Sequence, residues 1–384
     1  MLVAFDPLAQ DDPYAAYREL RDHAPVYRNE ERAFWALSRF DDVQRAAREW
    51  RALSSAEGVN LDDTLSLTGA GNFIAADPPD HDRLRRVVRD RFTPATVAAM
   101  EPAIRDDVRR TLAAAVGEGG FDAAAALAWA LPVRTISRLL GLPVEDEPML
   151  GEALRAVIRR EPEAARLPAA ARGAAERLRA YFLTHVATRR EAPADDLLGG
   201  VVAAEARGEL REEEIPGLCI LLYIAGTETV ADFVGNALVA LAEHPDQRAL
   251  LAAEPALAPR AVEELLRFES PVQYQVRTAT AALELHGVTV PAGGRVALLW
   301  AAANRDERRW ERPDDLDLTR EPKRNLAFGE GIHHCLGAPL ARLQGRIVLE
   351  EMLRAMPCYR LAGPVERVAT HNTRGVARLP IAAG

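Results

Sequence analysis

Apolar residues recur at helical spacing along most of the chain, and this pattern predicts a mainly helical protein. Acidic residues at the start of an apolar face predict a helix over 41–50, and a very basic helix over 81–92 follows Asp77-Pro78-Pro79-Asp80. Clusters of glycine and proline separate the later segments that have helical period. These further predicted helices cover residues 95–116, 122–140, 145–160, 168–190, 212–243, 258–268 and 338–356.

The pattern changes period after residue 276. Residues 277–290 alternate between apolar and polar positions and contain His286-Gly287, which is typical of a hairpin turn. A turn at 291–294 precedes a predicted strand at 295–300, and the C-terminal segment alternates weakly. Since no internal repeat and no linker-like segment is visible, we expect one large domain over 1–384, mainly α with small β-sheets.

Charge and composition exclude several classes of protein. The 384 residues carry a formal net charge of −9, which disfavours nucleic acid as a partner. The N-terminus does not have the pattern of a signal peptide, and the longest apolar run, 218–225, is shorter than the ~20 residues that span a bilayer. We therefore expect a cytoplasmic protein with no membrane partner. The odd number and wide spacing of the cysteines fit a reducing compartment; they are Cys219, Cys335 and Cys358.

Cys335 lies in the sequence FGEGIHHCLG at 328–337, directly before a predicted helix. Backbone N–H groups of Leu336 and Gly337 and the helix dipole would favour a thiolate there and lower the thiol pKa. The glycines allow a flat ligand to approach the backbone, and Phe328 would shield the sulfur from water. The alternative interpretation is a glycine-rich turn with an inert cysteine.

The longest predicted helix carries Ala225-Gly226-Thr227-Glu228-Thr229 near its middle. Glycine in a helix interior costs about 1 kcal/mol, which favours a functional reason for this sequence. We expect a local widening of the helix that makes room for a ligand such as dioxygen, with Glu228 and Thr229 as an acid and an alcohol that pass protons. The alternative is a kinked core helix with Glu228 at the surface.

Two further helices carry paired polar residues. Glu264 and Arg267 share a helical face, where the default interpretation is an exposed ion pair worth a few tenths of a kcal/mol. His81 and Arg85 are spaced so that both can bind a carboxylate or phosphate, although a solvated basic face has the same pattern. Neither pair is specific alone.

The order of these motifs resembles the cytochrome P-450 family, in its soluble bacterial branch. An HxxxR helix, a long AGxET helix, an ExxR helix, Arg277 in a strand and FGxGxHxCxG follow one another, and the resemblance extends from Asp6-Pro7 to Leu379-Pro380. It implies the cytochrome P-450 fold, haem b (iron protoporphyrin IX) as cofactor, and Cys335 as the axial ligand of the haem iron. The residues that match haem-propionate ligands are His81, Arg85, Arg277 and His333.

The resemblance also assigns roles around the haem. Glu264 and Arg267 match a buried structural ion pair, completed by 304–306, and Glu228 with Thr229 matches the acid–alcohol pair that delivers protons during oxygen activation. Substrate-facing segments would be 55–76, 155–185, 222–225, 272–276 and 371–373. The predicted pocket residues are Ala225, Gln273, Tyr274, Gln275 and Val276. Two departures from the family pattern, Asn325 and Val230, leave the substrate class open.

The resemblance implies a haem-dependent monooxygenase that uses O2 and hydroxylates or epoxidises a medium-sized hydrophobic natural product in secondary metabolism. No flavin or iron–sulfur motif is present, so electrons from NAD(P)H would arrive through a separate ferredoxin reductase and ferredoxin. One alternative is oxidative coupling or ring closure without oxygen insertion, and another is a non-catalytic haem-binding protein. The basic residues expected to form a ferredoxin-docking face are Arg85, Arg86, Arg89, Arg91, Arg342 and Arg346.

Overall fold

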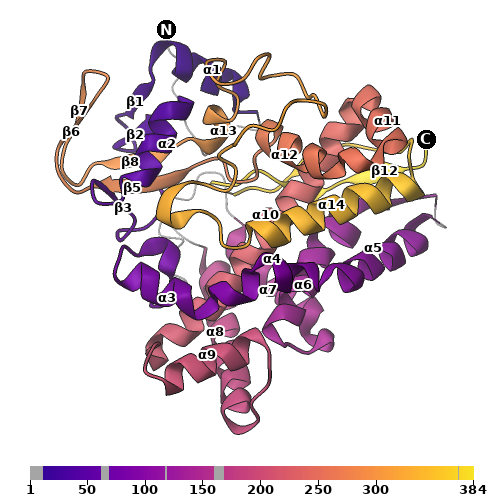
Figure 1. The fold of residues 1–384 in the computed structure, drawn as a ribbon, viewed down its shortest axis with the longest axis horizontal. Coiled ribbons are helices and arrows are strands. Elements are labelled where there is room, and N and C mark those ends of the chain that lie inside the picture. The colour runs from indigo at the N-terminus through magenta and orange to yellow at the C-terminus, as the bar shows by residue number, and fades with distance from the viewer. Residues whose placement is uncertain (1–11, 62–68, 117–118, 160–167, 371) are drawn as a thin grey trace.

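A computed structural model describes residues 12–61, 69–116, 119–159, 168–370 and 372–384. It confirms the prediction of a mainly helical protein with small sheets. Figure 1 shows α10 running through the middle of the molecule behind α14. The helices are α1 Tyr14–His23, α2 Phe40–Arg48, α3 Asp80–Arg89, α4 Pro94–Ala98, α5 Glu101–Val116, α6 Ala130–Leu140, α7 Glu147–Ile158, α8 Ala169–Glu191, α9 Leu197–Ala206, α10 Ile215–Glu243, α11 Pro245–Ala253, α12 Ala258–Phe268, α13 Trp300–Ala303 and α14 Ala338–Ala355.

The largest sheet has the strand order β1-β2-β8-β5-β3 and is antiparallel except for the β2–β8 pair. The hairpin β6–β7 turns at His286 and Gly287, which both have positive φ as a tight turn requires. The strands are β1 Val26–Asn29, β2 Phe34–Leu37, β3 Leu53–Ser54, β4 Gly120–Asp122, β5 Gln275–Ala279, β6 Leu283–Leu285, β7 Val288–Val290, β8 Arg295–Leu298, β9 Arg360–Leu361, β10 Glu366–Arg367, β11 Val376–Arg378 and β12 Pro380–Ala382.

Several predicted boundaries differ from the structure. The helix expected over 95–116 is divided into α4 and α5, and the one expected over 122–140 begins with a π-helical segment, Ala124–Trp129. The strands β1 and β2 and the helices α1, α9 and α11 were not predicted. The 277–290 region contains part of β5, which pairs with β3 and β8, in addition to the predicted hairpin.

The core is organised around α10. Its apolar side chains pack with those of α6, α8, α12 and α14 in the largest hydrophobic cluster. Among the described residues, the helical stretch Glu212–Glu243 alone is long and apolar enough to cross a membrane, and 72% of its most apolar window is buried inside the protein. This burial is what a core helix of a folded domain shows, because its apolar surface is already covered by protein.

Candidate active site

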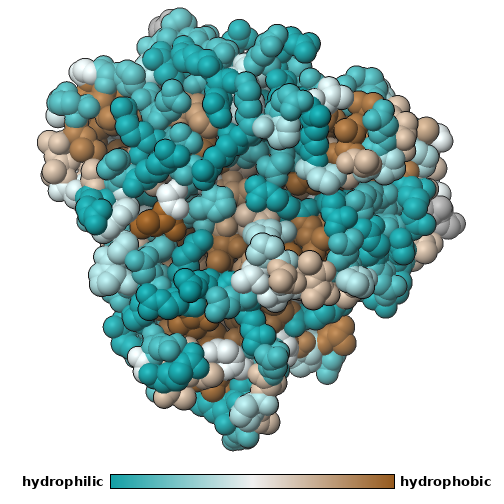
Figure 2. All heavy atoms as spheres, viewed as in Figure 1, coloured by the Kyte–Doolittle hydropathy of each residue, from teal (hydrophilic) through white to brown (hydrophobic). Residues whose placement is uncertain are grey.

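A largely apolar cavity lies between α10 and the loop that precedes α14. It contains roughly 1280 Å³ of space free of protein atoms, open solvent at its mouth included, and its wall includes Ala225, Thr229, His333 and Cys335. The viewed surface is mostly hydrophilic, and hydrophobic residues show in the gaps near its centre (Figure 2). The cavity therefore joins the two most distinctive sequence motifs, which lie far apart along the chain.

The cysteine loop holds Cys335 at the cavity wall. The N–H of Cys335 donates to the carbonyl of Phe328 at 2.9 Å, which closes the loop on itself. Burial raises the pKa of the Cys335 thiol, although backbone N–H groups of Gly337 and Ala338 and the Arg85 guanidinium act in the opposite direction. The expected lowering of this pKa is thus wrong, because loss of hydration outweighs the dipoles. The donors are also one residue further along than predicted.

The predicted propionate ligands gather beside this loop. The rings of His81 and His333 meet edge to face with centroids 4.6 Å apart, and Arg277 and Arg85 lie close enough to act electrostatically on His333. Burial, with these neighbouring cations, lowers the pKa of His333 to about 2. Burial also lowers the pKa of Arg277 to about 10. Four groups that can donate hydrogen bonds are therefore held together in a poorly hydrated place.

These four groups have donor capacity that the described residues do not use. Arg277 is 2% exposed and has no carboxylate within ion-pair distance in the described part of the chain; its Nη1 donates only to the neighbouring Val276 carbonyl. Nε2 of His81 and both ring nitrogens of His333 have no hydrogen-bond partner among the described residues. Burying an unpaired cation costs several kcal/mol, so the arrangement suits an anionic ligand. The residues present fit the two propionates of a haem.

The acid–alcohol pair lies on α10, which runs through Gly226 as a regular helix. The expected local widening is therefore not found. The Thr229 hydroxyl instead donates to the carbonyl of Ala225 at 3.1 Å, one turn earlier in the helix. Thr229 lines the cavity, and the Glu228 carboxylate accepts a hydrogen bond of 3.1 Å from the Thr373 hydroxyl. An additional methyl at Gly226 would lie 2.8 Å from the terminal methyl of Ile136, so a larger residue would require that side chain to shift.

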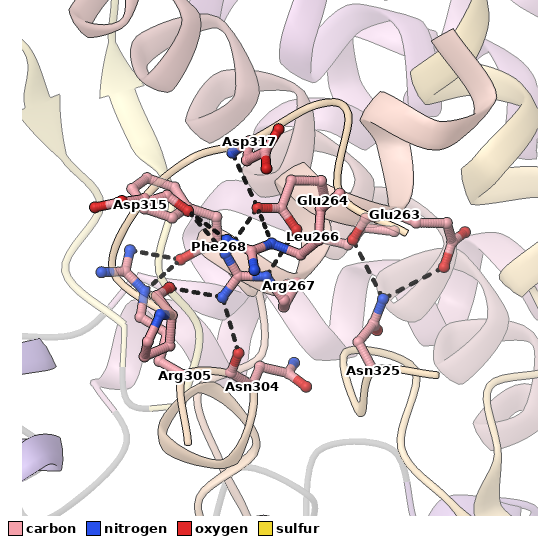
Figure 3. Close-up of polar contacts among 12 residues, drawn as sticks. Glu263, Glu264, Leu266, Arg267, Phe268, Asn304, Arg305, Asp315, Asp317 and Asn325 are labelled. Atoms are coloured by element: carbon pink, nitrogen blue, oxygen red, sulfur yellow. Dashed lines mark hydrogen bonds and ion pairs between the residues drawn. The ribbon is translucent and has the colours of Figure 1, made fainter. Parts of the chain in front are cut away.

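The Glu264–Arg267 pair is buried, so the exposed-pair interpretation is wrong. Two parallel hydrogen bonds of 2.7 and 2.8 Å join the side chains, which are 4% and 1% exposed. The Arg267 guanidinium also donates to the carbonyls of Asn304, Pro313 and Asp315. Figure 3 shows these groups converging from α12 and from the loop after α13. The pair thus ties the irregular 304–320 region to the helical core.

The structure separates the predicted pocket residues into two groups. Ala225 and Gln275 line the cavity. Tyr274 and Val276 instead pack in a core cluster with Tyr17, because successive residues of a strand point to opposite faces. Gln273 is also buried away from the cavity, and it accepts from the Tyr17 hydroxyl at 3.1 Å.

Other predicted substrate-facing segments are only partly described. Residues 62–68, 160–167 and 371 lie outside the described residues. Within the described part of the first segment, Phe73 and Ile74 line the cavity. Asn372 and Thr373 lie beside the segment before β5, since the carbonyl of Asn372 accepts from the Gln273 N–H at 2.8 Å.

Two polar residues near the cavity were not singled out from the sequence. Gln344 on α14 lines the cavity, is fully buried, and has no partner for either amide atom among the described residues. Asp232 on α10 is 1% exposed and lies one turn after Glu228. The spacing of Asp232 from Glu228 in an otherwise apolar helix could have indicated a second functional carboxyl. No sequence pattern distinguished Gln344 from other polar helix residues.

A mainly helical fold with a cysteine loop at an apolar cavity and a buried group of cationic donors defines the class of haem-thiolate proteins. The cytochrome P450 family model matches residues 165–357. Cytochrome P450 123 of Mycobacterium tuberculosis is 39% identical over 99% of this chain and 96% of its own. The vitamin D(3) 25-hydroxylase of Pseudonocardia autotrophica is 36% identical over 97% and 94%. The crystal structure of CalO2 has 35% identity and a TM-score of 0.90 over 99% of both chains.

The chain belongs to the cytochrome P450 family. It is a haem-dependent monooxygenase, as the hydroxylase names among its relatives and the family's haem cofactor indicate. Its neighbours among solved structures are bacterial members of the same family.

Proposed function

We propose that the cavity binds haem b, that the Cys335 sulfur would bind its iron, and that His81, Arg85, Arg277 and His333 would hold the propionates. The observation that carries this proposal is the buried Arg277 guanidinium, which has no carboxylate partner in the described part of the chain and lies beside His333. When bound, haem supplies the reductive activation of dioxygen, so that one oxygen atom enters a substrate and the other leaves as water.

In this proposal Glu228 and Thr229 move protons at the oxygen side of the cavity. Thr229 lines the cavity, and its hydroxyl can exchange its bond to the Ala225 carbonyl for one to a group in the cavity. Glu228 follows in the relay, because its carboxylate lies on the same helix and is positioned by Thr373. The role is general acid catalysis, which needs a hydroxyl and a carboxyl within reach of each other or of one water.

The substrate is a medium-sized hydrophobic natural product that is hydroxylated or epoxidised in secondary metabolism. Support comes from the cavity wall, where Phe73, Leu222 and Val272 are apolar lining residues and Gln275 offers one amide. A relative named for the hydroxylation of vitamin D(3) supports the same substrate class. The protein works in the cytoplasm.

The experiment is a spectral-shift screen of hydrophobic natural products, followed by turnover of each hit with NAD(P)H, ferredoxin reductase, ferredoxin and isotopically heavy dioxygen. A product that gains one heavy oxygen atom supports the proposal. A product that only loses hydrogen identifies oxidative coupling instead, and a spectral shift without NAD(P)H consumption identifies a binding protein. Either of these results overturns the oxygen-insertion proposal.

The electrons come from a separate ferredoxin that docks near α3. Not all of the expected docking arginines are available, because Arg342 pairs with Glu263, and Arg346 pairs with Glu101 and Glu350. Arg86 and Arg89 on α3 are exposed, and the ion pair of Arg89 with Asp90 is itself open to solvent. They carry the positive charge that would steer an acidic partner.

Charge reversal tests this docking face. Arg86→Glu combined with Arg89→Glu should lower the rate of ferredoxin-dependent reduction about 10-fold at low salt, and less at high salt. Arg179→Glu on the exposed face of α8 is the matched control and should leave the rate unchanged. Equal rates and equal salt dependence in the α3 variant and the wild type would show that ferredoxin docks elsewhere.

A further inference from the structure

Helix α10 carries a second carboxyl, Asp232, one turn after Glu228. Asp232 is 1% exposed, and its Oδ2 has no hydrogen-bond partner among the described residues. The fold makes space for this side chain, because a Cβ at Gly375 would lie only 1.7 Å from Asp232 Oδ1. Any residue other than glycine at position 375 would therefore displace the carboxyl. The fold therefore accommodates Asp232 as a buried carboxyl and does not leave it at the surface.

A single hydroxyl lies between the two carboxyls. Thr373 donates to Oε1 of Glu228 at 3.1 Å, and its side chain lies close enough to Asp232 to lower the pKa of that carboxyl in part. The hydroxyl oxygens of Thr373 and Thr370 lie 2.8 Å apart. The segment is held in place because the Arg374 N–H donates to the carbonyl of Pro271 at 2.7 Å.

The surroundings favour the protonated form of Asp232. The charged groups that face it are Glu228 on its own helix and Arg367 on β10. Arg367 donates to the Asn236 side chain at 2.6 Å, and in the described part of the chain no cation lies within ion-pair distance of Asp232. Burial, and next the negative charge of Glu228, raise the pKa of Asp232 well above its ordinary range. Asp232 therefore holds a proton under conditions in which an exposed aspartate has lost it.

We propose that Asp232 stores a proton and passes it through the Thr373 hydroxyl to Glu228. In this step the Asp232 carboxylic acid gives its proton to Thr373 Oγ1, and Thr373 gives its own proton to the Glu228 carboxylate. The Asp232–proton bond breaks, the Glu228–proton bond forms, and Thr373 is unchanged. Asp232 regains a proton from solvent by way of the half-buried Thr370. Asp232 acts through Glu228 and is a positioning residue, and the inference rests on the proposed role of Glu228.

The stored proton can be measured without turnover. Infrared difference spectra of the resting holoenzyme at neutral pH should show a carboxylic-acid carbonyl band that Asp232→Asn lacks and that the exposed control Asp106→Asn keeps. A raised folded-state pKa means that wild-type stability falls as pH rises from about 4, and this fall should be smaller in Asp232→Asn. If Asp232→Asn leaves both the band and the pH dependence unchanged, Asp232 stores no proton.

Proton transfer from Asp232 to Glu228 is tested by measuring the consumption of dioxygen in the presence of ferredoxin and NAD(P)H. Asp232→Asn and Thr373→Val should each lower kcat for dioxygen consumption about 3- to 10-fold and raise its solvent isotope effect, with KM for ferredoxin unchanged. The double variant should be no slower than either single variant, because both changes interrupt one route. Thr184→Val, an exposed threonine on α8, is the control. Additive losses, or a lower kcat with the wild-type pH profile and isotope effect, would mean a structural role only.

These outcomes separate the inference from the proposed function. If the wild type consumes dioxygen but never oxygenates a substrate, the proposed function fails while the infrared band and isotope effects still test Asp232. If the wild type oxygenates substrates and Asp232→Asn matches it in kcat, band and isotope effect, only the inference about Asp232 fails.

Discussion

The imidazole rings of His81 and His333 meet edge to face with centroids 4.6 Å apart, and together they link α3 to the cysteine loop. Nε2 of His81 and both nitrogens of His333 have no partner among the described residues, although His81 is buried and His333 is half-buried beside Arg277. The protein therefore presents a set of donors that suits an anionic ligand. Folding of this region and binding of the ligand are energetically linked, since the ligand removes the cost of burying a cation.

Arg277→Met should change the stability of the apoprotein and the retention of haem in opposite directions. The apoprotein should gain about 1 kcal/mol, because an unpaired buried cation is replaced by an apolar side chain of similar length. The holoprotein should lose haem about 10- to 100-fold more readily, because a charge-assisted hydrogen bond is worth about 1.5–3 kcal/mol. Urea unfolding of the apoprotein and transfer of haem to an apoglobin measure the two effects. A less stable apoprotein together with faster loss of haem would mean that Arg277 is only a structural residue.

Sequence periodicity predicted most of the long helices, because their apolar faces are read directly from spacing. It did not predict β1 and β2, which are four residues each and join a sheet in which β2 pairs with β8 from the second half of the chain. Short strands carry too few residues to establish a period. Their pairing with β8 is a property of the tertiary structure.

The candidate site shows the same limit. The i,i+3 spacing of Glu264 and Arg267 indicates a shared helical face, but their burial depends on the 304–320 region, which lies far along the chain. Asp232 was not predicted from the sequence because the residues beside it, Thr373 and Gly375, come from the C-terminal segment. Sequence motifs identified residues with chemistry, whereas the structure was needed to show which of them share an environment.

Glu264→Gln should destabilise the holoprotein by about 3 kcal/mol, because it leaves the buried Arg267 guanidinium without its counter-charge. Arg320, whose Nε donates to Glu264 at 3.0 Å, would lose its counter-charge as well. The urea midpoint measures the change. Glu209→Gln breaks the exposed pair with Arg207 and is the matched control, with a loss below about 1 kcal/mol. Equal losses of unfolding free energy in Glu264→Gln and Glu209→Gln would show that burial does not increase the contribution of the ion pair.

Glu351 should make stability depend on pH in acid. Burial would raise its pKa, but hydrogen bonds from Arg109, Arg105 and Arg354 outweigh burial and lower the pKa to about 2. Because this lies below the unfolded value of about 4.3, the stabilisation is present above about pH 4.3 and is lost as pH falls through about 2. Glu351→Gln should lower the free energy of unfolding by about 2 kcal/mol at neutral pH. The difference from the wild type should disappear as pH falls from about 4.3 to about 2.

A series of urea titrations between neutral pH and about pH 2 measures the effect of Glu351→Gln. Glu176→Gln, on the exposed face of α8, is the control and should change stability little at every pH. A gap for Glu351→Gln that stays constant with pH would show that the side chain contributes by packing and not by charge.

Cys335→His should abolish the thiolate-type absorption spectrum of the reduced carbon monoxide complex, because imidazole nitrogen donates less charge to iron than thiolate sulfur. Haem binding itself should weaken by a smaller factor, since the donors for the propionates are intact. Cys358→Ser is the control, as this cysteine is exposed and free. Persistence of the thiolate spectrum in Cys335→His would assign the ligand to another residue.

Thr229→Ala should lower the amount of product formed per NAD(P)H consumed about 3- to 10-fold, with little change in substrate affinity. The reason is that the variant keeps the shape of the cavity but removes the hydroxyl that can exchange its bond to the Ala225 carbonyl for a partner in the cavity. Thr227→Ala is a demanding control on the same helix. The Thr227 hydroxyl makes the equivalent bond to the Tyr223 carbonyl at 2.8 Å, but the residue is fully buried away from the cavity. Product yield per NAD(P)H should stay at the wild-type level in Thr227→Ala, and an equal loss in both variants would attribute the effect to the helix and not to the Thr229 hydroxyl.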